Sequence, residues 1–218
     1  MTMTWKWKRA GSGLIAGAAA ALMIGASVAP ALAATPTWTV KPGGNISAKS
    51  GTTVLTDTKT HTVLKCASSS TKATLKKGKK LSGAGIGSIT SLSFTKCTGP
   101  FGLTFTVKSS ASTKKPWKLN AVSYNRKTGV TSGTITGIHA TLSGTGCSAV
   151  VDGSSAAKDN GSVKVTYTNK THRLAVQAAG GTLHIYDVKG CLGLIGNGQA
   201  STFTGTYVVS PGQTITSP

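Results

Sequence analysis

Apolar and polar residues alternate with a period of two through most of the chain that follows residue 34. The segment 103–107 has the sequence LTFTV, and the segment 163–168 has the sequence VKVTYT. Because the side chains of a strand point to opposite faces in turn, this alternation predicts strands with one buried face. Apolar residues at helical spacing are absent from the same region, so we expect strands throughout, with a short helical turn near 192–195.

Polar residues that favour turns separate these segments. They occur at 56–61, 125–129 and 169–172, and Asp152-Gly153 has the composition of a two-residue hairpin turn. Strands separated by turns at intervals of about 8–12 residues are typical of sandwiches and barrels. We therefore predict an all-β fold, an antiparallel β-sandwich or barrel that forms a single β-domain over residues 34–218.

The first 33 residues have a different composition. Three basic residues lie within the first nine, the stretch 10–29 is uncharged and rich in Ala and Gly, and Ala31-Leu32-Ala33 ends the segment. A basic start, an apolar centre and a small-x-small end are typical of a secretory signal peptide. We predict cleavage after Ala33 in preference to an uncleaved membrane anchor. The mature chain is then secreted and extracellular, or associated with the cell wall without a covalent anchor.

Four cysteines follow this segment, and an even number in an exported chain predicts two disulfides. Sequence alone leaves three connectivities open. We favour Cys66–Cys97 with Cys147–Cys191, because each pair then closes a loop within one half of the chain. The cysteine and histidine spacings match no zinc motif, so we expect no metal and no cofactor.

Positive charge is concentrated in the first half of the mature chain. Residues 34–127 contain sixteen Lys or Arg and one Asp, whereas residues 128–218 contain five and three. Two runs stand out, KKGKK at 76–80 and KKPWK at 114–118. Ammonium groups bind polyanions by releasing counterions, and an adjacent indole adds stacking or cation–π contacts. The candidate polyanion-binding residues are Lys76, Lys77, Lys79, Lys80, Lys114, Lys115, Trp117 and Lys118.

The same residues have a second, structural interpretation. Exposed lysines on strand faces prevent edge pairing and maintain solubility, and Trp117 suits a core position as well as a ligand contact. The excess of Lys over Arg favours diffuse attraction over shaped recognition. The expected partners are anionic cell-wall polymers or other extracellular polyanions. We expect no specific nucleic acid and no stable membrane span after cleavage.

The sequence lacks the local motifs of common hydrolases. It contains neither G-x-S-x-G nor H-E-x-x-H, and its acidic residues are four Asp with no Glu. The four histidines, His139 among them, are expected at turns or on exposed strand faces. Asp152 and Asp159 are expected to form turns. We therefore predict a non-enzymatic protein with no catalytic residue.

Four stretches of the chain resemble known proteins: 83–107 (GAGIGSITSLSFTKCTGPFGLTFTV), 117–124 (WKLNAVSY), 128–138 (TGVTSGTITGI) and 147–153 (CSAVVDG). They are similar to small exported Thr/Gly-rich proteins of actinobacteria, most of them hypothetical. The resemblance extends over nearly the whole mature chain and implies an exported β-protein with disulfides. It carries over no active-site residue. In that group Thr or Ser often stands where this chain has Lys, so the strong positive charge is a departure.

These patterns favour an exported, non-enzymatic cell-surface or extracellular β-protein that binds anionic wall or extracellular polymers through its lysine-rich half. Two other functions stay open at the level of sequence. One is a small extracellular hydrolase or enzyme inhibitor whose site forms only on folding. The other is a self-associating surface coat or pore-like β-protein.

Overall fold

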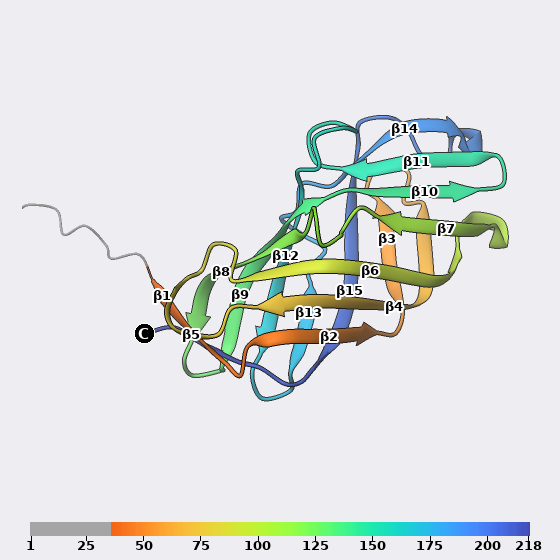
Figure 1. Cartoon of the computed structure of the whole chain (residues 1–218). Coiled ribbons are helices and arrows are strands. Elements are labelled where there is room, and N and C mark those ends of the chain that lie inside the picture. The colour runs from red at the N-terminus through yellow and green to blue at the C-terminus, as the bar shows by residue number, and fades with distance from the viewer. Residues whose placement is uncertain (1–35) are drawn as a thin grey trace, which may run out of the picture. The chain divides into compact units, whose positions relative to one another are not determined.

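Strands make up most of the regular structure in this computed structural model, which describes residues 36–218 (Figure 1). The signal-peptide prediction for residues 1–33 falls outside the described residues. The all-β prediction is confirmed, and two single-turn 3₁₀ segments, η1 (Pro100–Gly102) and η2 (Cys191–Gly193), accompany the strands. Among residues 36–218 the structure contains no helix with the length and apolar character needed to cross a membrane. The strands are β1 (Thr37–Lys41), β2 (Gly44–Ser50), β3 (Thr53–Asp57), β4 (Val63–Leu75), β5 (Gly78–Ser82), β6 (Gly87–Thr98), β7 (Thr104–Ser109), β8 (Trp117–Asn125), β9 (Val130–Ile138), β10 (Ala140–Gly144), β11 (Cys147–Asp152), β12 (Gly161–Thr168), β13 (Arg173–Val176), β14 (His184–Gly190), β15 (Gln199–Ser210) and β16 (Thr214–Thr216).

The antiparallel strand pairings close on themselves twice. One ring runs β4-β6-β8-β9-β12-β13-β15-β2 and returns to β4. A second ring runs β4-β6-β7-β10-β11-β14-β15-β3 and also returns to β4. Closure removes the exposed edges that an open sheet presents for aggregation. The smaller sheet β16-β1-β5 is separate from these rings.

Three long strands, β4, β6 and β15, belong to both rings and join them end to end (Figure 1). In β15 the first half pairs with β14 and β3, and the second half pairs with β13 and β2. In β4 the residues before Cys66 pair with β3, and those after it pair with β2. Each long strand therefore passes from one ring into the other as its neighbours change.

The apolar positions of the alternating segments face the interior. Val163, Val165 and Tyr167 of β12 are all buried, and Trp38 of β1 is the largest fully buried side chain. Most of the buried apolar residues of the described chain pack in one core cluster. A cavity of about 110 Å³ lies among them, lined almost entirely by apolar side chains such as Ala48 and Phe94. A cavity of this character is expected to stay dry.

The two disulfides have the connectivity that the sequence favoured. Cys66–Cys97 joins β4 to β6 at a point where the two residues are direct cross-strand partners. Cys147–Cys191 joins the start of β11 to η2. Each bond therefore links chain segments that are already neighbours in the strand pairing. Among residues 36–218 no cysteine is left unpaired.

The hairpin predicted at Asp152-Gly153 is wrong. β11 pairs with β10 and β14, whereas β12 pairs with β9 and β13, so the two strands that flank this dipeptide are not partners. The Asp152 side chain is buried and accepts hydrogen bonds from the backbone N–H groups of Gly153, Asp159 and Asn160. The carboxylate thus holds a longer loop in place. A two-residue turn motif does not predict hydrogen bonds to residues seven and eight positions further along the chain.

Two buried serines in adjacent strands give a matched stability test. Ser50 and Ser69 are cross-strand partners in β2 and β4. The hydroxyl of Ser69 donates to Tyr207 Oη at 2.7 Å, whereas that of Ser50 has no hydrogen-bond partner among the described residues. Burial raises the pKa of Tyr207 to about 12, although the bond from Ser69 acts in the opposite direction. The Tyr207 phenol is therefore neutral at physiological pH.

We expect Ser50→Ala to leave the free energy of unfolding unchanged or to raise it by up to about 1 kcal/mol, because it removes an unsatisfied buried hydroxyl. Ser69→Ala is expected to lower it by about 1–2 kcal/mol, because Tyr207 loses its partner. Urea unfolding of both variants provides the comparison. Equal destabilisation by the two substitutions would contradict this account of the Ser50 hydroxyl.

Candidate polyanion-binding surface

Four neighbouring strands carry exposed lysines on the outside of the closed sheets. The outward-pointing side chains of β2, β4, β6 and β7 form what we call the basic surface. The lysines of these strands are Lys49 on β2, Lys65 and Lys72 on β4, Lys96 on β6 and Lys108 on β7, and all five are exposed. Strand register places Lys49, Lys72 and Lys108 on the same face, because Lys49 pairs with Ser70, Ser70 with Ser93, and Ser93 with Lys108, and Lys72 lies two residues after Ser70.

Hydroxyl groups fill the space between these lysines. Ser70 Oγ and Ser93 Oγ are 2.9 Å apart, and Ser68 Oγ lies 2.6 Å from Thr95 Oγ1. These bonds run across the β4–β6 pair and repeat along it. Hydroxyls can donate to phosphate or carboxylate oxygens, so the surface offers neutral donors between its cationic groups.

No acidic residue lies in the four strands that form the basic surface. Asp57 and Asp152 are buried, with exposed fractions of 1% and 0%, and their carboxylates hold loops together through backbone N–H groups. Asp187 lies on β14, in another part of the fold. Among residues 36–218, the single ion pair between a lysine and a carboxylate joins Lys115 to Asp159. The lysines of the basic surface thus have no internal counterion.

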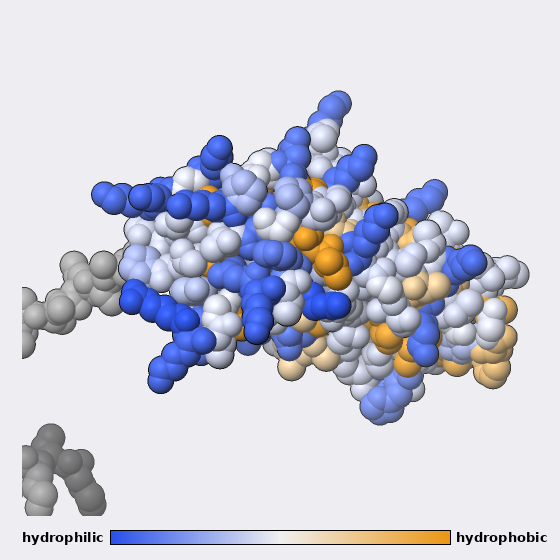
Figure 2. Space-filling view, turned by 90° about the horizontal axis from the view of Figure 1, so that it is seen from below, coloured by the Kyte–Doolittle hydropathy of each residue, from blue (hydrophilic) through white to orange (hydrophobic). Residues whose placement is uncertain are grey.

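Hydrophilic side chains dominate much of the exterior. Figure 2 shows hydrophilic side chains projecting along the length of the face seen from below, with hydrophobic atoms exposed near its centre and towards its right-hand end. That end is the one at which the β6–β7 turn lies in Figure 1.

The two sequence runs occupy different parts of the fold. Lys76 and Lys77 lie between β4 and β5, and Lys79 and Lys80 lie on β5, within the small sheet; all four are exposed. Lys114 and Lys115 precede β8, and the Lys115 ammonium is already occupied by Asp159. Lys118 is the member of these runs that joins the outer face of the ring, where its Nζ lies 3.4 Å from Ser88 Oγ.

The inclusion of Trp117 among the polyanion-binding residues is wrong. Its side chain is 5% exposed and packs in the core, and its Nε1–H donates to Ser110 Oγ at 3.2 Å. An indole in that position has no free face for stacking on a ligand. Trp117 alternates with Lys118 along β8, so the apolar residue points inward and the lysine outward.

Sequence reasoning missed the basic surface because its lysines are isolated in the chain. Lys49, Lys72 and Lys108 each stand alone among Ser, Thr and Ala residues. One available signal was their position on the polar face of alternating strands, which places every such lysine on the exterior. Which strands are neighbours then decides whether they meet, and that is set by long-range pairing.

A second polar cluster brings together residues that the sequence did not connect. His139, between β9 and β10, has its Nδ1 3.0 Å from Asp152 Oδ2 and 3.4 Å from Asp159 Oδ1. The expectation of an exposed strand-face position for His139 is therefore wrong, because only 21% of its side chain is exposed. Asp159 lies in the loop 153–160, whereas Asp152 is the buried last residue of β11, so its predicted role as a turn former is wrong.

Hydrogen bonds fix the charge state of Asp152. Burial alone would raise its pKa, but hydrogen bonds from His139 and from the backbone N–H groups of Gly153, Asn160 and Asp159 outweigh burial and hold the pKa below its ordinary value of 3.8. Both carboxylate oxygens are thereby occupied. Within residues 36–218, no hydrogen bond joins His139 to a serine or threonine hydroxyl. The hydrogen bonds of this cluster hold the loop 153–160 in place, and we assign the cluster a structural role.

Comparisons with models of protein families, with curated proteins and with solved structures find no match to this chain.

Proposed function

We propose that this protein is exported, is not an enzyme, and holds anionic polymers of the cell wall or extracellular space on its basic surface. The observation that carries the proposal is the charge distribution on β2, β4, β6 and β7. The four strands carry five exposed lysines together with many hydroxyl groups, and none of the strands contains an acidic residue. The two disulfides are consistent with an oxidising compartment outside the cytoplasm.

Binding of this kind is driven by counterion release. A polymer with closely spaced phosphates or carboxylates carries condensed cations, and each lysine that replaces one of them releases it to the solution. Lysine is a compact point charge without the planar fork of arginine, so it attracts anions without selecting a particular geometry. We infer a ligand class defined by charge density, with teichoic-acid-type polyphosphates as its most charged members.

The scaffold keeps this array in a fixed arrangement. Lys49 and Lys108 lie three strands apart in one row, which corresponds to roughly 15 Å at the usual strand spacing. Both strands belong to closed rings, so they do not need to reorganise when a polymer binds. Pre-arranged charges lose little conformational freedom on binding other than that of the lysine side chains.

A charge-matched pair of variants tests the proposal. The first replaces Lys49, Lys72 and Lys108 with Gln; the second replaces Lys127, Lys158 and Lys170, which are exposed in turns and loops outside the basic surface. We expect the first to bind immobilised poly(glycerol phosphate) at least about tenfold more weakly at low salt, with the slope of log K against log salt reduced by about three. The second should change that slope by less than about one.

Both variants lose the same net charge, so the comparison separates a binding site from a general effect. Equal weakening by the two triple substitutions would show that only net charge matters, and would favour the solubility interpretation. If the unmodified protein bound poly(glycerol phosphate) with an affinity that did not depend on salt concentration, the proposal would be contradicted.

A further inference from the structure

Two large apolar side chains project into solvent from the two 3₁₀ turns. Phe101 in η1 is 86% exposed, and Leu192 in η2 is 88% exposed. Both exceed every other exposed large apolar residue of the described chain, the next being Val122 at 59%. An isolated exposed apolar residue needs no explanation, but two in equivalent turns do.

The backbone at both positions is unfavourable for these residue types. Phe101 has φ of 56° and Leu192 has φ of 50°, in the left-handed region that bulky side chains avoid. Glycine adopts this conformation freely, and it directly follows both residues as Gly102 and Gly193. A glycine at either position would remove both the backbone strain and the exposed apolar surface. Neither packing nor turn geometry therefore accounts for Phe101 and Leu192.

The two turns lie at the same end of the molecule. One small cavity of about 40 Å³ is lined by Gly99 and Pro100 next to Phe101, and by Cys191 and Leu194 on either side of Leu192. Figure 1 shows the β6–β7 turn and the end of β14 at the same side of the second ring. Phe101 and Leu192 thus form an apolar tip, the name we use for these two side chains.

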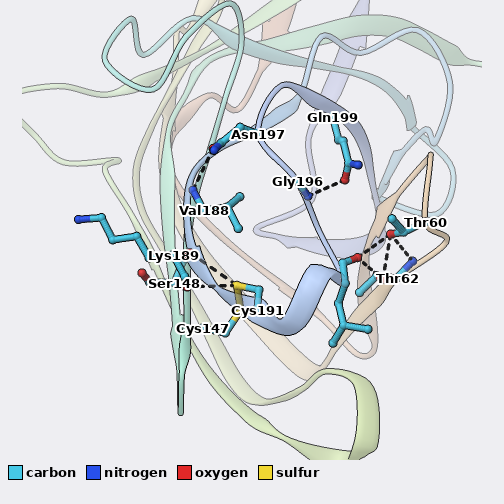
Figure 3. Close-up of a disulfide and its surroundings, with 11 residues drawn as sticks. Thr60, Thr62, Cys147, Ser148, Val188, Lys189, Cys191, Gly196, Asn197 and Gln199 are labelled. Atoms are coloured by element: carbon cyan, nitrogen blue, oxygen red, sulfur yellow. Dashed lines mark hydrogen bonds between the residues drawn. A yellow bond between two sulfur atoms is a disulfide. The ribbon is translucent and has the colours of Figure 1, made fainter.

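Covalent and hydrogen bonds hold the η2 turn in place (Figure 3). The Cys147–Cys191 disulfide fixes its start, and the hydroxyls of Thr60 and Thr62 both donate to the Leu194 carbonyl, at 2.7 and 2.6 Å. Further along, the Gly196 N–H donates to Gln199 Oε1. Leu192 is therefore held outward by a constrained turn.

The η1 turn is built in the same way. The Cys66–Cys97 disulfide lies two residues before Gly99, whose N–H donates to the Leu103 carbonyl at 2.8 Å. The Leu103 N–H in turn donates to the Pro100 carbonyl at 3.1 Å, which closes the turn around Phe101. Each apolar side chain of the tip thus has its own disulfide-supported turn.

Lysines flank the tip. Lys96 immediately precedes Cys97, Lys189 lies two residues before Cys191, and Lys65 is the cross-strand partner of Thr98; all three are exposed. The acidic residues nearest along the chain are Asp57, which is buried, and Asp187 on β14. An apolar centre with cationic flanks complements an interface that is apolar inside and anionic at its surface.

We propose that the apolar tip inserts into the headgroup–acyl boundary of a lipid bilayer that carries anionic lipids. Phe101 and Leu192 enter the boundary, while Lys65, Lys96 and Lys189 contact the headgroups. Two short side chains give reversible, weak attachment that charge strengthens. The contact shares Lys65 and Lys96 with the strands of the basic surface, but Phe101 and Leu192 lie outside those strands, so substitution of these two residues tests it separately from the proposed polymer binding.

Vesicle flotation tests the proposal directly. The full chain is expressed in a secreting host, and the protein recovered from the medium is used, with its N-terminus determined by mass spectrometry. Binding to vesicles of phosphatidylcholine with and without phosphatidylglycerol is measured for the unmodified protein, for F101S/L192S, and for V122S/V208S. The last variant removes two exposed apolar side chains, 59% and 46% exposed, at other places on the surface.

We expect binding to the anionic vesicles that falls by about tenfold or more in F101S/L192S and stays unchanged in V122S/V208S. A Leu192→Trp variant should show a blue shift of its emission with anionic vesicles. Equal binding by F101S/L192S and the unmodified protein would overturn the proposal. The proposal would also be overturned if F101S/L192S changed the oligomeric state on a sizing column without losing vesicle binding. That result would mean that the tip contacts a second copy of the chain.

Discussion

Asp152→Asn is expected to lower the free energy of unfolding by about 3 kcal/mol, because it removes a buried charge from partners arranged to receive it. The Asp152 carboxylate is fully buried and accepts hydrogen bonds from three backbone N–H groups at 2.6–2.9 Å, in addition to its contact with His139. An amide of the same shape keeps one acceptor oxygen and turns an N–H₂ group toward donors that it cannot satisfy. The loop 153–160 is expected to loosen first.

The effect depends on pH in a defined direction. The pKa of Asp152 is lowered in the folded protein, so its stabilising contribution is complete above the ordinary value of 3.8 and is lost as the pH falls through the lower folded-state value. The difference in unfolding free energy between the unmodified protein and Asp152→Asn should therefore shrink below pH 3.8. Urea unfolding between pH 2 and 7 measures it.

Asp187→Asn is the matched control, because Asp187 is exposed on β14 and its substitution should change stability by less than about 0.5 kcal/mol. If Asp152→Asn were as stable as this control at neutral pH, the carboxylate would not be the element that holds the loop together.

Removal of the Cys147–Cys191 disulfide is expected to cost about 4 kcal/mol. The bond spans 44 residues, and restriction of a loop of this length in the unfolded chain accounts for most of that value in the chain-entropy model. For a domain of this size, the melting temperature of Cys147→Ser/Cys191→Ser should fall by on the order of 10 °C. Differential scanning calorimetry of the oxidised protein and the double variant measures the change.

The double variant also separates the two surfaces. Loss of the disulfide frees the start of η2 and with it Leu192, so vesicle binding should weaken, whereas the basic surface should retain the polymer. Cys66→Ser/Cys97→Ser, whose bond spans 31 residues, should be destabilised by a similar amount. Two double variants that melt like the unmodified protein would show that neither bond stabilises the fold.

Local patterns predicted the all-β fold and the buried face of strands such as β12. In β12, Val163 and Tyr167 point inward and Lys164 outward, as the alternation required. The turn at 125–129 also joins paired strands, β8 and β9. The disulfide connectivity was favoured because each pair closes a loop within one half of the chain, and in the structure Cys66 and Cys97 are direct cross-strand partners.

Long-range pairing was beyond the reach of the same patterns. The closure of both rings through β15 depends on which strands meet, and nothing in the period-two alternation specifies a partner. The same limit hid the basic surface, because Lys49 and Lys108 are far apart in sequence. It also hid the His139–Asp152 contact, which exists only because β10 and β11 place the ends of both segments together.

Composition predicted a strongly cationic chain, and the structure changes the interpretation of part of its two lysine runs. The runs at 76–80 and 114–118 attracted attention because their charges are adjacent, yet Lys115 is paired with Asp159 and Trp117 is buried. Single lysines at outward strand positions produce a broader array than either run. Charge adjacency in sequence is thus a poor guide to charge density on a sheet.

The most direct test of the proposed function measures retention of the secreted protein on isolated Gram-positive cell walls, before and after removal of their anionic polymers, across a salt titration. The account predicts strong retention at low salt that falls steeply as salt rises and disappears when the polymers are removed. Retention that is unaffected by salt and by removal of the polymers, or no retention at all, would contradict it.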